Sequence, residues 1–132
     1  MNELYEKLFH EIYLLTGQGE LDKFKSYLAE DASWTEAAGF PYSGTYVGLN
    51  EIVKYVYERL GSEWNNYAAK DLAYGFNGNQ VFVCGKYSGE FTATGKSFIA
   101  DFVHVYKFNA NNKVQKFIQV VDIHTFFWAT QD

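Results

Sequence analysis

Four long runs of alternating apolar and polar residues occupy the second half of the chain and constrain its fold more than any other feature. They cover residues 68–76, 80–91, 97–108 and 113–123, and the turn sequences NGN, TATGK and NANN separate them. Runs of this kind, joined by short turns, predict a meander of antiparallel strands. Gly85 and Gly89 lie inside the second run, where glycine predicts bulges or bends that let a sheet curl.

The first half of the chain is typical of helices instead. Apolar residues recur at helical spacing over 4–15, 21–28 and 48–60, and glycines follow the first and third of these segments. Residues 32–37 predict a short strand before the turn sequence GFPYSG. The 132 residues match the size of one domain, 1–132. We therefore expect an α+β fold in which three helices cover the concave side of a curved sheet and leave an open-ended pocket.

Aromatic residues make up 20% of the chain, with 12 Phe, 11 Tyr and 3 Trp, which exceeds what a minimal core of this size needs. A large interface or an apolar pocket should absorb the surplus. The net charge of −5 predicts that the chain binds neither nucleic acid nor a membrane surface, because both attract basic proteins.

The sequence carries no signal for export or for membrane insertion. Its start, MNELYEKLFHEIYLL, has acids where a signal peptide has bases, and no run approaches transmembrane length. Cys84 is the one cysteine, so neither an internal disulfide nor a thiolate metal cluster can form. We therefore expect a cytoplasmic protein.

A single acid, Glu36, interrupts the apolar face of the predicted strand 32–37. Alternation puts Glu36 and Trp34 on one face and Ser33 and Thr35 on the other. If Trp34 points into the core, Glu36 does too, and a carboxyl among aromatic rings loses hydration, which raises its pKa and suits it to proton transfer. The alternative is a strand-end acid that reaches solvent beside the turn. Glu36 is a candidate catalytic residue, and Trp34 a candidate ligand contact.

The run 97–108 has an aromatic face that carries one histidine. The residues on this face are Phe98, Ala100, Phe102, His104, Tyr106 and Phe108. A histidine there can donate to a developing enolate, carry a proton or satisfy a neighbouring carbonyl in the core. We treat His104 as a candidate catalytic residue, and Phe102 and Tyr106 as candidate ligand contacts.

The run 113–123 also carries a polar side chain on an apolar stripe. Gln119 shares a face with Phe117 and Val121, and an inward Gln can orient a ligand carbonyl, bridge strands or bind an ordered water. Phe117 and Gln119 are therefore candidate ligand contacts. The hydroxyl of Tyr13 on the first helix is another, with core packing as the alternative.

Asp122 and His124 stand two residues apart at the end of this run and could be a metal pair. No third and fourth ligand at suitable spacing accompany them, so we expect no metal. The chain also lacks the G-x-S-x-G motif of a nucleophilic serine.

The order of these segments resembles the nuclear transport factor 2-like superfamily, in its SnoaL-like and ketosteroid-isomerase-like branch. The stretches AEDASWTEAAGFPYSGTYVG, YSGEFTATGKSF, HVYKFNANNKV and VVDIHTF carry the resemblance, which covers nearly the whole chain. It implies a cone-shaped antiparallel sheet wrapped on three helices, a deep apolar pocket and a homodimer through the outer sheet face. It implies no single function, since the superfamily includes isomerases, cyclases and non-enzymes.

The resemblance also assigns roles to single residues. Aligned with the ketosteroid isomerase pattern, Glu36 takes the position of the general-base Asp, and His104 that of the protonated Asp that binds the oxyanion. Tyr13 lies one residue out of register with the oxyanion-hole Tyr of that family. In SnoaL-like cyclases the His of the penultimate strand matches His104, whereas the acid/base Asp of the last strand falls on Gln119, which cannot take up a proton.

Together these residues favour cofactor-independent proton-transfer chemistry, isomerase-like or cyclase-like, on a hydrophobic carbonyl compound. Glu36 would remove a proton from an acidic C–H, and His104 with Gln119 would stabilise the enolate. The alternative is a pocket that holds an apolar metabolite without chemistry, or a dimerisation module. A protein-transport adaptor like the superfamily's namesake is a third possibility.

Overall fold

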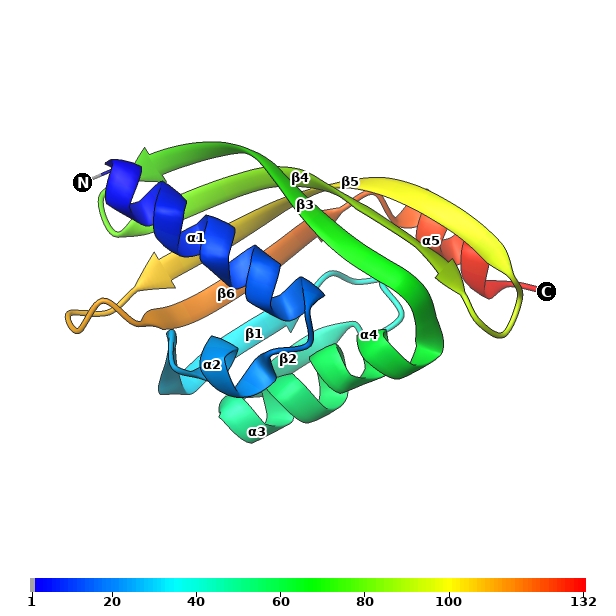
Figure 1. Cartoon of the computed structure of the whole chain (residues 1–132), viewed down its shortest axis with the longest axis horizontal. Helices are drawn as coiled ribbons and strands as arrows, with labels where there is room; N and C mark the ends of the chain where they lie inside the picture. The colour runs from blue at the N-terminus through cyan, green and yellow to red at the C-terminus, as the bar shows by residue number, and fades with distance from the viewer. Residues whose placement is uncertain (1) are drawn as a thin grey trace.

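The computed structural model describes residues 2–132 and shows a curved sheet with helices on its concave side (Figure 1). The sheet has six strands in the order β2-β1-β6-β5-β4-β3. They are β1 (Leu28–Glu36), β2 (Gly44–Val47), β3 (Trp64–Asn77), β4 (Gln80–Phe91), β5 (Lys96–Phe108) and β6 (Val114–Val121). The predicted α+β class and curved sheet are confirmed, and β3 to β6 form the predicted meander.

The N-terminal strands join the meander in a way that the sequence did not predict. β1 begins at Leu28 rather than at residue 32 and runs parallel to β6, with Trp34 beside Phe117, so the sheet is antiparallel except at this pair. On its other side β1 pairs with β2, where the hydroxyls of Thr35 and Thr45 are hydrogen-bonded at 2.9 Å. β2 escaped prediction because it is four residues long and mostly exposed, which leaves no alternation to detect.

Three helical segments cover the concave side, as predicted. They are α1 (Asn2–Gly17), α2 (Leu21–Lys25) and a continuous helix made of α3 (Leu49–Ile52), a π-turn (Val53–Tyr57) and α4 (Glu58–Glu63). α2 is shorter than predicted, because Leu28 already belongs to β1. The side chain of Leu4, where the predicted first helix begins, lies outside the described residues.

A fourth helix, α5 (Ile123–Thr130), corrects the prediction for the end of the last strand. β6 ends at Val121 rather than at residue 123, and α5 follows it directly. The segment IHTFFWAT is apolar enough for a buried strand or a helix, so its pattern alone did not distinguish them. Phe126 of α5 packs against Phe98 of β5, with ring centroids 4.2 Å apart.

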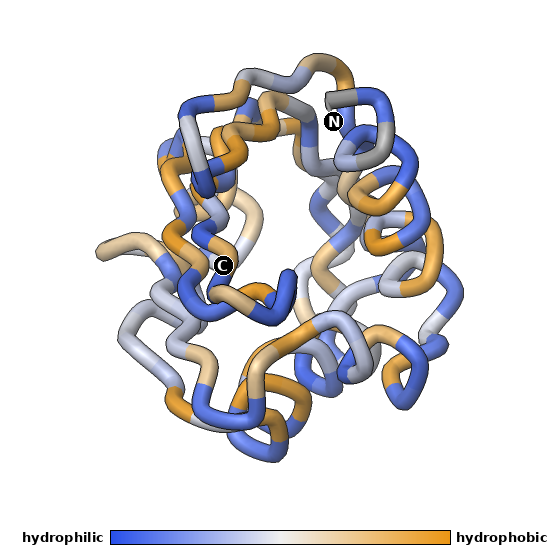
Figure 2. The backbone as a smooth tube through the Cα atoms, turned by 90° about the vertical axis from the view of Figure 1, so that its left-hand side faces the viewer, coloured by the Kyte–Doolittle hydropathy of each residue, from blue (hydrophilic) through white to orange (hydrophobic). Residues whose placement is uncertain are grey.

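The core fills the space between the sheet and the helices. Figure 2 shows the backbone turned by a right angle, with sheet and helices around a common interior. Among the fully buried side chains are Phe9, Phe24, Trp34, Phe117 and Phe126. Aromatic rings therefore supply most of the apolar surface that holds the helices to the sheet.

The outer face of the sheet carries exposed apolar side chains. Ile99 on β5 and Val120 on β6 are 64% and 56% exposed; Ile99 lies between two buried residues, and Val120 follows the buried Gln119. The homodimer through this face stays a prediction. Within residues 2–132, no helix is both long and apolar enough to cross a bilayer.

Gly85 lies where three strands approach one another closely. A Cβ atom at this position would stand 2.2 Å from the carbonyl oxygen of Lys70 on β3 and 2.4 Å from Cζ of Phe102 on β5. The register of β3 against β4 shifts twice, once opposite Gly85 and once opposite Gly89, so the irregularities lie on β3, across from the glycines. Glycine here lets the sheet curve around the ring of Phe102.

Gly85→Ala should lower the free energy of unfolding by about 2 kcal/mol or more, because the added methyl group overlaps the backbone of β3. Gly75→Ala is the matched control, since its Cβ would meet only Cβ of Phe82 at 3.9 Å. We expect the control to stay within roughly 0.5 kcal/mol of the parent in urea unfolding. Equal stability of the two variants would contradict the close approach at Gly85.

Candidate functional site

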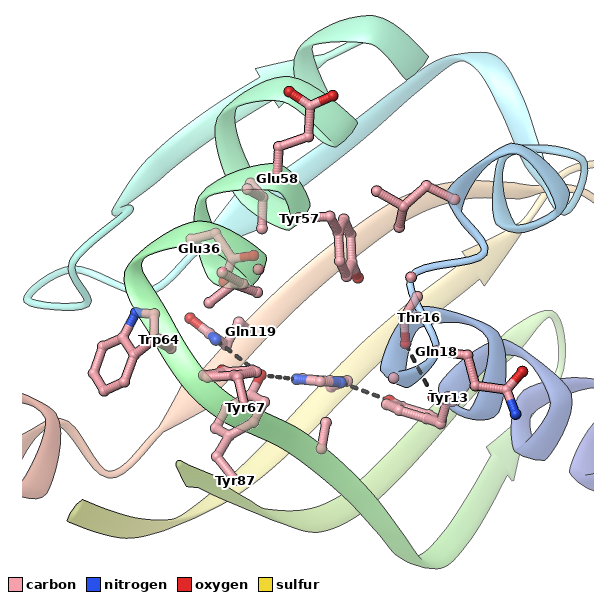
Figure 3. Close-up of a pocket in the computed structure, with 18 of the residues that line it drawn as sticks. Tyr13, Thr16, Gln18, Glu36, Tyr57, Glu58, Trp64, Tyr67, Tyr87 and Gln119 are labelled. Carbon is pink, nitrogen blue, oxygen red and sulfur yellow. Dashed lines mark hydrogen bonds between the residues drawn. The ribbon is translucent and has the colours of Figure 1, made fainter. Parts of the chain in front are cut away.

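A pocket of about 410 Å³ lies between the concave face of the sheet and the helices (Figure 3). The end of α1, the π-turn, α4 and inward side chains of β1 and of β3 to β6 build its wall. Large aromatic rings make up much of this wall: Tyr57, Trp64, Tyr67, Tyr87 and Phe117. Its volume suits a small organic molecule.

Glu36 is held inside this pocket by the alternation of β1. It points inward like Trp34, is only 5% exposed, and does not reach solvent beside the turn. Its Oε2 atom has no hydrogen-bond partner among residues 2–132. Burial raises the pKa of Glu36 to about 8, and the neighbouring Trp34 indole offsets part of that rise. The carboxyl is therefore mostly protonated at neutral pH, and a small rise in pH is enough to ionise it.

His104 is buried on β5, and both of its ring nitrogens contact hydroxyl groups. Nδ1 lies 2.6 Å from the hydroxyl of Tyr13, and Nε2 contacts the hydroxyl of Tyr87. The ring of Phe102 stacks on the imidazole, with centroids 4.0 Å apart. Burial lowers the pKa of His104 well below its usual range, so the ring is neutral.

Gln119 gives these hydrogen bonds a direction. Its Oε1 accepts from the backbone N–H of Ala37 at 3.0 Å, which orients the amide so that Nε2 donates to the hydroxyl oxygen of Tyr87 at 2.9 Å. The proton of Tyr87 is then free to be donated to Nε2 of His104. Gln119 therefore determines which atom donates and which accepts in each hydrogen bond of this chain of contacts, although it cannot exchange a proton itself.

The direction of this chain determines the tautomer of His104. A neutral imidazole that accepts at Nε2 carries its proton on Nδ1 and donates it to the hydroxyl oxygen of Tyr13. Tyr13 then donates to the hydroxyl of Tyr106 at 2.9 Å. Burial raises the pKa of Tyr13 well above its usual range, so its hydroxyl keeps its proton.

The structure brings most of the predicted site residues to one cavity. Those that line the pocket are Tyr13, Glu36, His104, Phe117 and Gln119. The remaining ones, Trp34, Phe102 and Tyr106, are buried directly behind them. Trp34 stacks on Phe117 at 4.0 Å between centroids, Phe102 stacks on His104, and Tyr106 is hydrogen-bonded to Tyr13. These three residues thus support the wall from behind.

Sequence analysis missed Tyr67 and Tyr87. Tyr87 shares a face of β4 with Val81 and Val83, both buried, so the alternation of the run 80–91 could have placed it inward. Tyr67 offered no such signal, because β3 begins at Trp64, before the predicted run 68–76.

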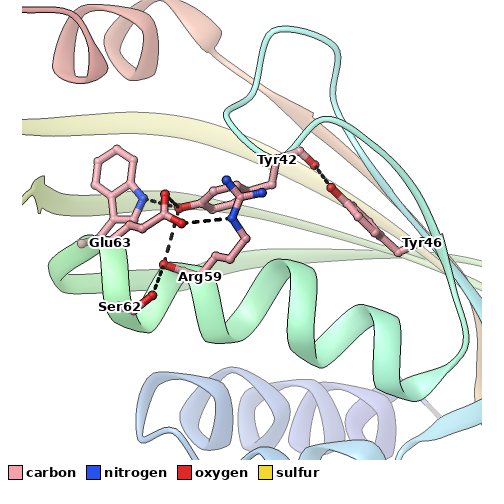
Figure 4. Close-up of polar contacts among 6 residues, drawn as sticks. Tyr42, Tyr46, Arg59, Ser62 and Glu63 are labelled. Atoms are coloured by element: carbon pink, nitrogen blue, oxygen red, sulfur yellow. Dashed lines mark hydrogen bonds and ion pairs between the residues drawn. The ribbon is translucent and has the colours of Figure 1, made fainter. Parts of the chain in front are cut away.

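A hydrogen-bond network holds the rim of the pocket beside Trp64 (Figure 4). Trp64 Nε1 donates to the hydroxyl of Tyr42 at 2.9 Å, and this hydroxyl donates to Glu63 at 3.1 Å. The Arg59 guanidinium pairs with Glu63 at 3.0 Å and lies over the Tyr42 ring. Tyr46 donates to the Tyr42 carbonyl at 2.9 Å. The GFPYSG turn is thereby held against α4, which fixes the orientation of the Trp64 ring.

The pair Asp122 and His124 forms a helix cap. The Asp122 side chain accepts from the backbone N–H of His124 at 3.1 Å and so begins α5. No cluster of three or more His, Cys, Asp or Glu side chains in the described part of the chain is arranged to hold a metal ion.

Stability should fall between about pH 6.5 and 8 because of Glu36. The pKa of Glu36 is about 8 in the folded protein and 4.5 ordinarily, so the folded state favours the protonated form. The free energy of unfolding therefore falls by up to roughly 1.4 kcal/mol per pH unit as pH rises. Below pH 6.5, the ordinary pKa of histidine, the unfolded chain takes up a proton on His104, whereas burial lowers the pKa of His104 in the folded protein. Stability therefore falls as pH drops below 6.5 on account of His104, opposite to the effect of Glu36. Urea unfolding of Glu36→Gln should lack the fall above pH 6.5. A parallel pH profile in the variant would refute the raised pKa.

The tautomer of His104 can be read directly from ¹⁵N chemical shifts. The parent protein should show a proton on Nδ1 and a bare Nε2 at neutral pH. Gln119→Leu removes the donor to Tyr87 and should give a mixture of tautomers, because the direction of the chain is no longer set. Gln115 lies on the same strand as Gln119 and contacts Asp31 at an exposed position, so Gln115→Leu should leave the tautomer pattern of the parent protein. A proton on Nε2 in the parent would overturn the assigned direction.

Comparison with known proteins agrees with this architecture. The SnoaL-like domain family matches residues 9–117. A crystal structure of a nuclear transport factor 2-like protein from Burkholderia thailandensis is 35% identical, with a TM-score of 0.89 and 96% of each chain covered. None of the curated proteins compared with the chain matches it.

More distant structures share the fold. One is named as a SnoaL-like polyketide cyclase from Shewanella denitrificans, with 14% identity, a TM-score of 0.80 and 96% of each chain covered. Another is named as a polyketide cyclase from Xanthomonas campestris, with 12% identity, a TM-score of 0.81 and the same coverage. The chain therefore belongs to the SnoaL-like family, within the nuclear transport factor 2-like superfamily.

Proposed function

We propose that the pocket performs cofactor-independent proton transfer on a hydrophobic carbonyl compound, as an isomerase or a cyclase does. The observation that carries this proposal is Glu36, a carboxyl with a pKa of about 8 on the wall of an aromatic pocket. A general base works best when its pKa lies near the pH of the reaction. The cyclase names of two similar structures support carbonyl chemistry in this fold.

In the proposed reaction, ionised Glu36 takes a proton from the carbon next to the carbonyl group. The electrons of the broken C–H bond move into the carbonyl system and form an enolate, and protonated Glu36 then returns the proton to another carbon. Hydroxyl groups on the pocket wall, such as those of Tyr57 and Tyr87, supply hydrogen bonds to the enolate oxygen. Low local polarity strengthens these bonds, because aromatic rings make up much of the wall.

His104 takes part through the hydroxyls that it holds. Tyr13 and Tyr87 occupy its two nitrogens, so the ring orients these phenols rather than facing a ligand with a free N–H. When Tyr87 donates its proton to an enolate oxygen, it gives up its hydrogen bond to Nε2 of His104. The new hydrogen bond is stronger, because its acceptor carries a negative charge. His104 is thus proposed as a positioning residue.

One observation favours the second candidate, binding of an apolar metabolite without chemistry. The amide of Gln119 and the phenols of Tyr13 and Tyr87 are already hydrogen-bonded within the protein. A wall whose polar groups satisfy one another suits an apolar ligand, because no buried group is left without a partner when the ligand binds. Glu36 departs from this pattern, because its Oε2 atom has no partner within residues 2–132.

Deuterium exchange distinguishes the two candidates. Cyclohex-3-enone and larger alkylated analogues, incubated in D₂O with the protein, should exchange the protons next to the carbonyl and shift to the conjugated isomer. Glu36→Gln should lower the exchange rate by roughly 100-fold or more, the usual scale for loss of a general base. Glu58→Gln, at an exposed acid on the rim of the same pocket, should change it by less than about twofold.

The rate should also rise with pH around the Glu36 pKa of about 8, because only the ionised carboxyl accepts a proton. Equal rates in Glu36→Gln and the parent would refute the catalytic role. Ketones that bind by saturation-transfer NMR without any exchange would favour the non-catalytic candidate.

A further inference from the structure

The charged groups around the pocket have one sign. Among the described residues that line it, the acids are Glu36 and Glu58, and no Lys or Arg is present. Arg59, the neighbour of Glu58, does not line the pocket; its guanidinium donates to Glu63 and lies over the ring of Tyr42 (Figure 4). A ligand in this pocket therefore meets no positive side chain.

The C-terminal ends of two helices add further negative charge to the pocket. α1 reaches the pocket with its C-terminal turn, where Thr16 and Gly17 line the wall, and that turn holds no basic residue. The long helix that ends in α4 also presents its last turn, with Leu60 and Gly61 on the wall and again no basic residue. The C-terminus of a helix carries roughly half a negative charge, which attracts cations.

Glu36 supplies an acceptor that the protein leaves unused. Its Oε2 atom is buried without a hydrogen-bond partner within residues 2–132, although the side chain is 95% removed from solvent. The Trp34 indole N–H lies near enough to lower the pKa of Glu36 but makes no hydrogen bond to any described residue, and the amide of Gln119 on the neighbouring strand β6 is committed to Tyr87. A buried acceptor without a donor is costly, so a ligand that brings an N–H has an advantage over one that does not.

We propose that the pocket selects hydrophobic amines in their protonated form, with the ammonium N–H donated to the Glu36 carboxylate. The ammonium group would complete the hydrogen bonding of Oε2, and its charge would match the Glu36 carboxylate and the two helix ends. The apolar part of the amine would rest against Tyr57, Trp64 and Tyr67, whose rings also attract cations. This inference rests on the pocket of the proposed function, but not on its proton-transfer step.

The groups that face Glu36 from the surrounding elements allow a clear test by pH. They are the phenols of Tyr57 on the helix, Tyr67 on β3, Tyr87 on β4 and Tyr106 on β5, and burial raises the pKa of each. None of these phenols ionises between pH 6 and 8, and His104 stays neutral over the same range, because burial lowers its pKa. The charge that changes inside the pocket is therefore that of Glu36.

The test compares two probes of the same shape, the N,N-dimethylbenzylammonium ion and its neutral isostere isobutylbenzene, by NMR titration. Affinity for the ammonium probe should increase at least tenfold from pH 6 to pH 8, as Glu36 ionises, while affinity for isobutylbenzene should not increase. At pH 8, Glu36→Gln should weaken the ammonium probe at least tenfold and leave isobutylbenzene within twofold. Glu58→Gln, at the exposed rim, should weaken the ammonium probe by less than threefold.

Benzyltrimethylammonium separates charge from hydrogen bonding, because it keeps the positive charge without an N–H. It should bind at least threefold more weakly than the tertiary ammonium probe. The inference is overturned if the two isosteres respond alike to pH, or if Glu36→Gln affects both equally. The ketone exchange assay reports separately on the proposed function: exchange without amine selectivity overturns this inference alone, and amine selectivity without exchange overturns the catalytic proposal alone.

Discussion

The stack of Trp34 on Phe117 is the contact on which the site depends. It joins β1 to β6 in the parallel pair and so attaches the N-terminal hairpin to the meander. Inward positions two residues further along the same strands hold Glu36 and Gln119, which therefore meet at one place on the wall. The Ala37 N–H then binds Gln119 and orients its amide. A shift of β1 by one residue against β6 would turn Glu36 and Trp34 to the outer face, because side chains alternate along a strand, while Gln119 would stay inward through the pairing of β6 with β5.

Desolvation keeps both ionisable groups of the site uncharged near neutral pH, but the protein treats them differently. His104 has a partner on each nitrogen, so its neutral form is fully satisfied and the hydrogen bonds tie three strands and a helix together. Glu36 has an oxygen without a partner, so neither of its charge states is well satisfied by the protein alone. A buried ionisable group without a partner, such as Glu36, marks a place where a ligand can complete the hydrogen bonding. His104, with both nitrogens paired, supports the site instead.

Alternation along the strands placed His104 and Gln119 on apolar faces, but it left Glu36 open between an inward position and a strand end that reaches solvent beside the turn. The same rule would have placed Tyr87 inward, but it cannot tell which inward side chains touch each other. That information depends on register, and the parallel β1–β6 pair joins segments far apart in the sequence. Helix α5 was not predicted: the predicted last strand included only its first residue, Ile123, and Asp122 is the one cap residue that marks the start of a helix there.

The parallel pairing of β1 with β6 also affects how the molecule is made. The hydrogen bond from Ala37 to Gln119 spans 82 residues of sequence, and contacts at such separation form late because the intervening chain must first be ordered. During synthesis, β1 leaves the ribosome long before its partner strand and must wait with an apolar face uncovered. The cavity therefore exists only after the last strand has docked, so a truncated or stalled chain would expose aromatic surface rather than retain a partial site.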